Sequence, residues 1–132
     1  MSADHLTQPI RVLVVDDNVD AAELVADLLS MLGYETSAAH DGESALRVWS
    51  TTRPDAVILD LGMPVMDGYE AARQIRKLSK SCLLIALSAW ARPADVERGR
   101  IAGFDHHIAK PASVEQLLEA LHSRLRAPVD LS

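Results

Sequence analysis

The stretch RVLVVDD at positions 11–17 decides the fold, because an apolar, β-branched run in it ends abruptly on Asp16 and Asp17. Two further apolar runs end in the same way: DAVILD ends on Asp60, and HHIA is followed by Lys110. Parallel strands of an open α/β sheet present ligands and catalytic groups at their carboxyl ends, in the crevice where the strand order reverses. We therefore expect three carboxylates and one amine to meet at one edge of a parallel sheet.

Such an acidic cluster is costly, because neighbouring carboxylates repel and raise one another's pKa unless a cation lies among them. Its presence therefore argues for a functional site. Asp16 and Asp17 could serve only as N-capping acids for the helix that follows. Their combination with Asp60 and Lys110 favours a site.

Short β-rich runs alternate with amphipathic stretches along the chain, which is typical of repeated βαβ units around a parallel sheet. The predicted strands cover 11–15, 36–39, 56–59, 82–88 and 106–109. The predicted helices cover 18–32, 43–50, a stretch after Gly68, 93–103, and 113 to about 126. Five βα units therefore account for almost the whole chain.

Residues at helix ends and on one face of each helix support these boundaries. Ser113, with Gln116 three residues on, matches a capping box. Pro93 suits a first helical turn, and Gly103 would end that helix, although Gly99 lowers its propensity. The expected buried faces comprise Ala21, Val25, Leu28 and Leu32 in the first helix, Ala45, Val48 and Trp49 in the second, Ala71, Ala72, Ile75 and Leu78 in the third, and Val114, Leu117, Leu118, Leu121 and Leu125 in the last.

Composition limits the function classes. With 132 residues and 48% hydrophobic content, the chain is long enough for one domain and too short for two. It carries no apolar stretch near the ~20 residues that span a bilayer and no signal peptide, and its lone Cys82 fits a reducing compartment, so we expect a cytoplasmic protein. The net charge of −6, without a Lys/Arg stripe, argues against nucleic-acid binding.

Four motifs together resemble the receiver domain of bacterial two-component response regulators. They are VLVVDDN, LDLGMPVMDGYE, ALSA and FDHHIAKP, and they stand in the family's order at the ends of four predicted strands, over roughly 11–126. The resemblance implies a flavodoxin-like, doubly wound (βα)5 three-layer sandwich with a parallel sheet of order 2-1-3-4-5. We expect a receiver domain over 10–127, with tails at 1–9 and 128–132.

The wording GFDHHIAKP, and Gly62 after Asp60 and Leu61, is most similar to receivers attached to hybrid sensor kinases. One alternative is therefore a receiver fragment of a hybrid histidine kinase. Met1 and the short tail after Arg126 favour a single-domain regulator instead.

The resemblance implies a role in a two-component phosphorelay. Asp60 would accept a phosphoryl group from the phosphohistidine of a sensor histidine kinase or a histidine phosphotransfer protein, and the altered surface would signal to a downstream protein. Because phosphohistidine is an activated donor, the acceptor needs only a carboxylate nucleophile, a cation and groups that stabilise charge. We therefore expect no enzyme in the ordinary sense, but a phosphoacceptor that catalyses its own phosphorylation and dephosphorylation.

The expected cofactor is Mg²⁺, which prefers about six oxygen ligands and keeps several waters. By resemblance, its ligands are Asp16, Asp17, Asp60 and the backbone carbonyl of Gly62. Because adjacent residues at a strand end diverge, Asp16 and Asp17 cannot approach the ion in the same way. In the family, the residue at Asp17 binds directly and the residue at Asp16 acts mainly through water.

Three further residues have roles implied by the resemblance. Lys110 would pair with Asp60 at rest and with a phosphoryl oxygen afterwards, and its peptide bond to Pro111 is cis in the family. Ser88 would turn its hydroxyl toward the phosphoryl group, and a ring on the last strand would follow it. That ring belongs to His107 here, where Tyr or Phe is commoner, so the switch is expected to be altered or pH-sensitive.

The remaining candidates have simpler interpretations. Asp67 precedes Gly68 and is interpreted as a turn or N-cap residue rather than a ligand. His106 and His107 face opposite sides of a strand and form no chelating pair. Trp90 lies at the mouth of the predicted site, where packing is the favoured role. The isolated histidines are interpreted as surface residues: His5, His40 and His122.

Two other classes share parts of this pattern. A phosphatase or phosphotransferase of the haloacid dehalogenase type also uses an aspartyl nucleophile with Mg²⁺, but it has a D-x-D pattern after its first strand, where this chain has Asp16-Asp17-Asn18. A flavodoxin-like cofactor carrier would need a phosphate-binding loop of hydroxyl residues there. Acidic residues would repel a flavin phosphate, so the receiver is the favoured interpretation.

Overall fold

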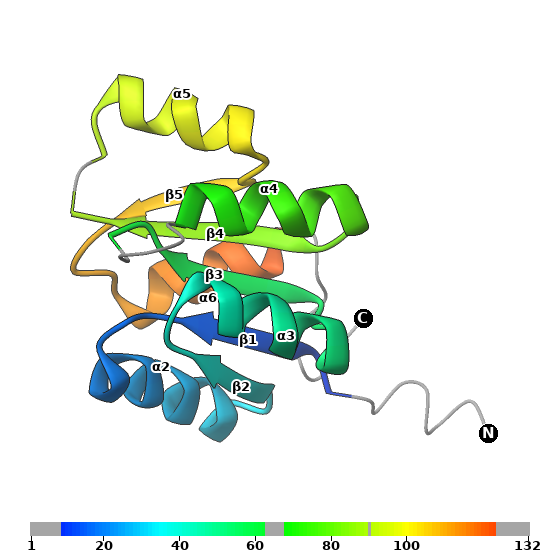
Figure 1. Cartoon of the computed structure of the whole chain (residues 1–132). Helices are drawn as coiled ribbons and strands as arrows, with labels where there is room; N and C mark the ends of the chain where they lie inside the picture. The colour runs from blue at the N-terminus through cyan, green and yellow to red at the C-terminus, as the bar shows by residue number, and fades with distance from the viewer. Residues whose placement is uncertain (1–8, 63–67, 90, 124–132) are drawn as a thin grey trace.

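Five parallel strands form one sheet in the order β2-β1-β3-β4-β5 (Figure 1). The computed structural model describes residues 9–62, 68–89 and 91–123. The strands are β1 (Arg11–Val15), β2 (Glu35–Ala39), β3 (Ala56–Asp60), β4 (Leu83–Ser88) and β5 (His106–Ala109). The helices are α2 (Val19–Met31), α3 (Gly42–Thr52), α4 (Gly68–Leu78), α5 (Pro93–Ala102) and α6 (Val114–His122). This is the predicted flavodoxin-like topology, and within the described residues no helix is long and apolar enough to cross a membrane.

Helices cover both faces of the sheet (Figure 1). One core joins α3, α4 and α5 to the strands and includes Trp49, Ile75 and Leu59. The other joins α2 and α6 to the strands and includes Leu29 and Ile58. Successive strand residues point to opposite faces, so neighbours on β3 belong to different cores. Every residue of β3 is buried, which explains its nearly unbroken apolar sequence.

The helix ends largely follow the predicted signals. Asn18 caps α2, and Ser113 with Gln116 forms the predicted capping box of α6. Gly103 adopts a left-handed conformation (φ 115°) and ends α5 as predicted. The last helix covers Val114–His122, and the Ser123 N–H bonds to the Ala120 carbonyl. The predicted continuation to about 126 lies outside the described residues.

The buried face of α2 differs from the predicted one. Leu28 and Leu32 were expected in the core, but they are 36% and 46% exposed, respectively. Ala22, Ala26 and Leu29 are buried instead. The alanines have no large side chain to hold the helix away from the sheet, whereas the periodicity of the larger residues follows a neighbouring stripe that faces solvent. The true buried face therefore begins one residue later than predicted.

Most other predicted core positions are confirmed. The buried ones are Ala45, Trp49, Ala71, Ala72, Ile75, Leu117 and Leu121, and the half-buried ones are Ala21, Val25, Val48, Val114 and Leu118. The prediction that Leu78 is buried is wrong, because this residue is the last of α4 and is 62% exposed. Leu125 lies outside the described residues.

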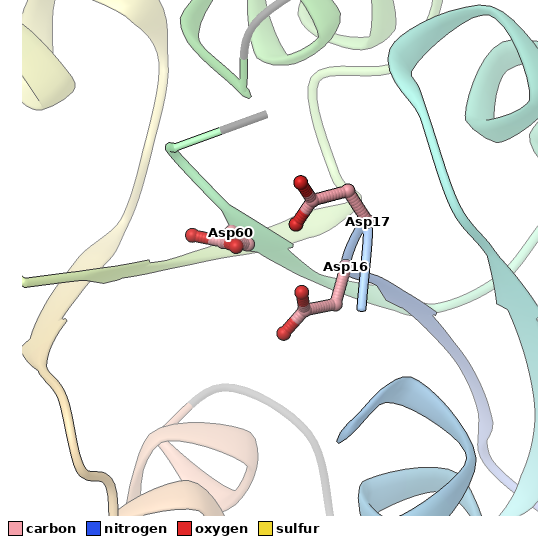
Figure 2. Close-up of side chains that lie close together, drawn as sticks. All are labelled: Asp16, Asp17 and Asp60. Atoms are coloured by element: carbon pink, nitrogen blue, oxygen red, sulfur yellow. The ribbon is translucent and has the colours of Figure 1, made fainter. Parts of the chain in front are cut away.

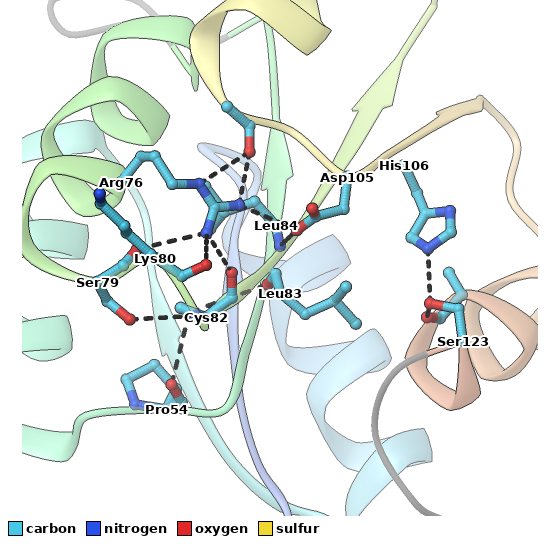
Figure 3. Close-up of polar contacts among 12 residues, drawn as sticks. Pro54, Arg76, Ser79, Lys80, Cys82, Leu83, Leu84, Asp105, His106 and Ser123 are labelled. Atoms are coloured by element: carbon cyan, nitrogen blue, oxygen red, sulfur yellow. Dashed lines mark hydrogen bonds and ion pairs between the residues drawn. The ribbon is translucent and has the colours of Figure 1, made fainter.

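The guanidinium of Arg76 joins the loops at the amino-terminal ends of β4 and β5 (Figure 3). It donates hydrogen bonds to the carbonyls of Gly103 (2.6 Å) and Cys82 (2.8 Å), and to two carbonyls between α4 and β4. It also pairs with Asp105 at 3.0 Å, and the same carboxylate oxygen accepts the Leu84 N–H at 2.9 Å. One side chain on α4 therefore holds the α4–β4 and α5–β5 loops in place. These loops lie at the end of the sheet opposite Asp60.

Replacing this guanidinium should destabilise the protein. Arg76→Met keeps the apolar stem but leaves several carbonyls without a donor, so we expect the free energy of unfolding to fall by about 2–3 kcal/mol. The matched control is Arg73→Met, which removes an exposed ion pair with Glu70 and should cost less than about 1 kcal/mol. Urea denaturation measures both variants, and equal losses would contradict the role assigned to Arg76.

Candidate functional site

The carboxyl ends of the central strands bring the predicted site residues together. Asp16 follows β1 directly, Asp60 ends β3, and Ser88 ends β4. β3 is the neighbour of both β1 and β4, so these ends are adjacent. Lys110 follows β5 and reaches Asp60, with Nζ 3.0 Å from Oδ1. The expected meeting of three carboxylates and one amine is therefore confirmed.

The three carboxylates form a tight cluster (Figure 2). One oxygen from each of Asp16, Asp17 and Asp60 lies within 4.8 Å of the others. Figure 2 shows Asp16 and Asp17 leaving the end of β1 in different directions, so the two carboxylates approach the cluster from different sides. Asp60 is buried, Asp16 is half-buried and Asp17 is exposed. The cluster is consequently open to solvent on the Asp17 side.

Two donors fix the carboxylate of Asp60. Its Oδ1 pairs with the Lys110 ammonium at 3.0 Å and accepts the backbone N–H of Gly62, also at 3.0 Å. A Cβ atom at position 62 would lie 3.6 Å from the same oxygen, so the glycine leaves this side of the carboxylate uncovered. The orientation of Asp60 is thus set from the β5 side and from its own loop.

Asp16 is held by the backbone around it. Its N–H donates to the Ala39 carbonyl at 3.1 Å, and its Oδ1 accepts the N–H of Asn18 at 3.0 Å. Burial raises the pKa of Asp16, and the charge of Asp60 raises it further, whereas the Asn18 N–H and the charge of Lys110 act in the opposite direction. The fold therefore holds this carboxyl group where its ionised form is disfavoured.

Ser88 and Lys110 are joined through the backbone. Ser88 is buried at the end of β4, and its carbonyl accepts the N–H of Lys110 at 2.8 Å. The peptide bond between Lys110 and Pro111 is cis, as the resemblance implies. Ser88 and Lys110 therefore stand at the same edge of the sheet as Asp60.

His106 and His107 face opposite sides of the sheet, as predicted. The Nε2 atom of His106 lies 2.7 Å from the Ser123 hydroxyl, beyond α6 (Figure 3). His107 lies against α5, where a Cβ atom at position 99 would come within 3.2 Å of its Nδ1. Gly99, which lowers the helix propensity of α5, is therefore the residue that makes room for the His107 ring.

Sequence reasoning missed His40. It was interpreted as an isolated surface residue, but it is half-buried and its Nδ1 lies 3.2 Å from the Asp16 carbonyl. The available signal was its position directly after β2, since the same reasoning located the other strand-end residues. Asp67, Trp90 and His5 lie outside the described residues.

The donor set fits a hard divalent cation. Carboxylate and carbonyl oxygens are the ligands that Mg²⁺ prefers, and it is commonly bound through one or two carboxylates together with water and phosphate oxygens. A cation here would also relieve the repulsion among the three aspartates. The arrangement can therefore hold such an ion beside a buried, oriented carboxylate.

Sequence comparison identifies the family. The sequence model of the response regulator receiver domain matches residues 12–122. The chain belongs to this family. Response regulator MprA of Mycolicibacterium vanbaalenii is 38% identical over 118 residues, which are 89% of this chain and 51% of that protein. The receiver chain thus spans about half the length of the curated relatives it matches.

Solved structures of receivers have the same fold. Chemotaxis protein CheY4 of Vibrio cholerae has a TM-score of 0.83 and 32% identity, covering 87% of this chain and 98% of its own. A Burkholderia pseudomallei response regulator, solved with a phosphorylated aspartic acid, a calcium ion and citrate, has a TM-score of 0.81 and 28% identity over 86% of this chain and 67% of its own. The chain is a receiver domain with a phosphoacceptor role in two-component signalling, and receivers interact with histidine kinases and downstream effectors.

Removing the charge of Asp16 should stabilise the metal-free receiver at neutral pH. Because the pKa of Asp16 is raised on folding, its stabilising contribution is complete below the ordinary value of 3.8 and is lost as the pH rises through the raised value. Asp16→Asn keeps an acceptor for the Asn18 N–H, and we expect it to raise the urea midpoint at pH 7 in EDTA.

The control for this measurement is Asp27→Asn, which removes one charge at an exposed position of α2 and should change the midpoint little. Added Mg²⁺ should then stabilise the wild-type receiver more than Asp16→Asn, because ligands stabilise the state that binds them. A lower midpoint for Asp16→Asn in EDTA would contradict the prediction.

Proposed function

We propose that this receiver accepts its phosphoryl group on Asp60. The observation that carries the proposal is the burial of this carboxylate at the end of β3, with Oδ1 bonded to Lys110 and to the Gly62 N–H. An oriented carboxylate needs little reorganisation to act as a nucleophile. The Burkholderia relative, which was solved with a phosphorylated aspartic acid, supports the same chemistry.

The transfer would form one bond and break one. A carboxylate oxygen of Asp60 attacks the phosphorus, and the phosphorus–nitrogen bond to the donor imidazole breaks, with its electron pair leaving on the nitrogen. Hydrolysis returns phosphorylated Asp60 to the free carboxylate, because water attacks the phosphorus, the bond from phosphorus to the carboxylate oxygen breaks, and inorganic phosphate leaves. The receiver would thus catalyse its own phosphorylation and dephosphorylation without being an enzyme in the usual sense.

The acidic cluster would hold a Mg²⁺ ion through Asp16, Asp17, Asp60 and the Gly62 carbonyl. When bound, the ion supplies positive charge to the phosphoryl oxygens. The exposed side of the cluster at Asp17 would admit the donor. The Asp16 Oδ1 atom already accepts the Asn18 N–H at 3.0 Å, which supports direct ligation by Asp17 and a water-mediated role for Asp16.

Lys110 and Ser88 would stabilise the product. The Lys110 ammonium, already 3.0 Å from Asp60, needs only a small movement to pair with a phosphoryl oxygen. The Ser88 hydroxyl, at the end of the adjacent strand, would donate to another. The proposed donors are a sensor histidine kinase or a histidine phosphotransfer protein, and the proposed location is the cytoplasm.

Phosphorylation is tested with small donors. Wild-type receiver incubated with Mg²⁺ and phosphoramidate should gain one phosphoryl group that hydroxylamine removes, measured by intact-protein mass spectrometry, and Asp60→Asn should gain none because an amide is a poor nucleophile. The control is Asp55→Asn, at the opposite end of the same stretch, which should label like wild type. Undiminished labelling of Asp60→Asn would overturn the assignment.

We further propose that phosphorylation changes α5, β5 and α6, with His107 as the ring that follows Ser88. Among the residues of α5, Gly99 and Ala102 are buried, whereas Val96 is 42% and Ile101 is 71% exposed. The Arg98 side chain of α5 also stacks over the Tyr69 ring of α4 at 4.0 Å. A helix with so few buried side chains is expected to be displaced more easily than one that packs by large apolar residues. The downstream protein would read this change.

Hydrogen exchange tests this output. With Mg²⁺ and beryllofluoride, which mimics the phosphoryl group, amide exchange in α5 and β5 should change severalfold, because displacement of α5 alters the protection of both. The internal control is the carboxyl-terminal end of α3, at residues 48–52, which lies away from the acidic site and where exchange should stay constant. Identical exchange over 91–123 in both states would remove this surface from consideration.

A further inference from the structure

We propose that His40 is a positioning residue for the acidic site, because its imidazole orients the peptide between Asp16 and Asp17. The Nδ1 atom of His40 lies 3.2 Å from the carbonyl oxygen of Asp16. That carbonyl belongs to the peptide unit joining the two aspartates, so the bond sets the direction in which the Asp17 side chain leaves the backbone. The inference rests on the proposed metal site and names a residue that supports it from outside.

The atoms determine the direction of this hydrogen bond. A backbone carbonyl can only accept, so Nδ1 of His40 must carry the proton. The neutral ring is therefore the Nδ1–H tautomer, and the protonated ring donates from the same atom. The bond to Asp16 persists in both protonation states, which suits a structural anchor.

His40 stands on a rigid support. It lies between the end of β2 and the capping box of α3, in which Asp41 and Ser44 bond to each other. Its own N–H donates to the Ser44 hydroxyl at 3.3 Å, and the preceding residue, Ala39, accepts the Asp16 N–H at 3.1 Å. Two consecutive residues therefore bind the backbone of Asp16. Ala39, at the end of β2, accepts its N–H, and His40, directly after β2, donates to its carbonyl.

The remaining anchors of Asp16 act on different atoms. Asn18 binds the carboxylate and Ala39 accepts the N–H, so the carbonyl is the backbone group that His40 alone restrains among the contacts described for Asp16. Without His40, the Asp16–Asp17 peptide can rotate, and Asp17 can leave the position in which its oxygen lies within 4.8 Å of Asp60. Groups that orient metal ligands through hydrogen bonds commonly change metal affinity when they are replaced.

The first test measures Mg²⁺ binding to the full chain by titration calorimetry with MgCl₂. His40→Ala should weaken the affinity about tenfold. His40→Asn should retain nearly the wild-type affinity, since its Nδ2 occupies the place of Nδ1 and can donate to Asp16. His122→Ala serves as the matched control, because this histidine bonds to Tyr34 instead and its loss should leave Mg²⁺ binding unchanged.

The second test needs no metal. Long-range ¹H–¹⁵N spectra of the neutral imidazole should show the Nδ1–H tautomer for His40, and His40→Ala should shift the Asp17 amide while His122→Ala leaves it in place. If His40→Ala only destabilised the fold, neither the Nδ1–H tautomer of the wild-type ring nor the retained Mg²⁺ affinity of His40→Asn would be expected.

Three results would overturn the proposal: an Nε2–H tautomer, unchanged Mg²⁺ affinity in His40→Ala, or equal losses in His40→Ala and His40→Asn. Asp17→Asn separates this failure from that of the metal site itself. If wild type and Asp17→Asn bind Mg²⁺ equally, the proposed ligands are wrong, and the tautomer and the Asp17 amide shift still decide whether His40 holds the peptide.

Discussion

Repulsion among three carboxylates is the constraint on which the rest of this receiver depends. Oxygens of Asp16, Asp17 and Asp60 lie within 4.8 Å of one another, and such a cluster opposes folding unless a cation joins it. Asp16 and Asp60 cannot simply move apart, because they stand at the ends of adjacent strands that are buried in the sheet. The surrounding hydrogen bonds therefore act on the backbone and side chains of the aspartates, and within the described part of the chain Lys110 supplies the counter-charge bonded to Asp60.

The two ends of the sheet divide stability and function. At the amino-terminal ends of β4 and β5, Arg76 donates to several carbonyls and pairs with Asp105, so charge and hydrogen bonding are matched there. At the carboxyl ends, like charges are collected and the pKa of Asp16 is raised by burial and by Asp60. A strained site is sustained by stability gained elsewhere in the fold. The hydrogen bonds and the ion pair of Arg76 thus offset part of the repulsion at the acidic end.

The fold and the residues of the acidic site could be predicted because both depend on short-range patterns. Alternating apolar runs and amphipathic stretches determine a βαβ topology, and the charged residues at the ends of those runs are brought together by the parallel order alone. The face of α2 could not be predicted in the same way. There, Ala22 and Ala26 pack against the sheet while the larger Leu28 faces solvent, and a pattern that weights large residues follows the wrong stripe.

Contacts between distant segments were also beyond the sequence. The position of His40 directly after β2 places it at the acidic edge of the sheet, but the turn of its ring toward the Asp16 carbonyl depends on the register of β2 against β1. The relation of Gly99 to His107 is similar. In the sequence the glycine only weakens a helix, whereas in the structure it is buried against the imidazole.

This last contact explains why α5 is suited to transmit a change. A larger residue at position 99 would lie 3.2 Å from Nδ1 of His107 and would force the ring or the helix to shift. The converse also holds, since a movement of the His107 ring alters the surface on which α5 rests. Because α5 buries only Gly99 and Ala102, the proposed displacement from the end of β4 through His107 would meet little resistance from the helix. In the proposed switch, the small buried surface of α5 and the missing side chain at Gly99 would therefore act together.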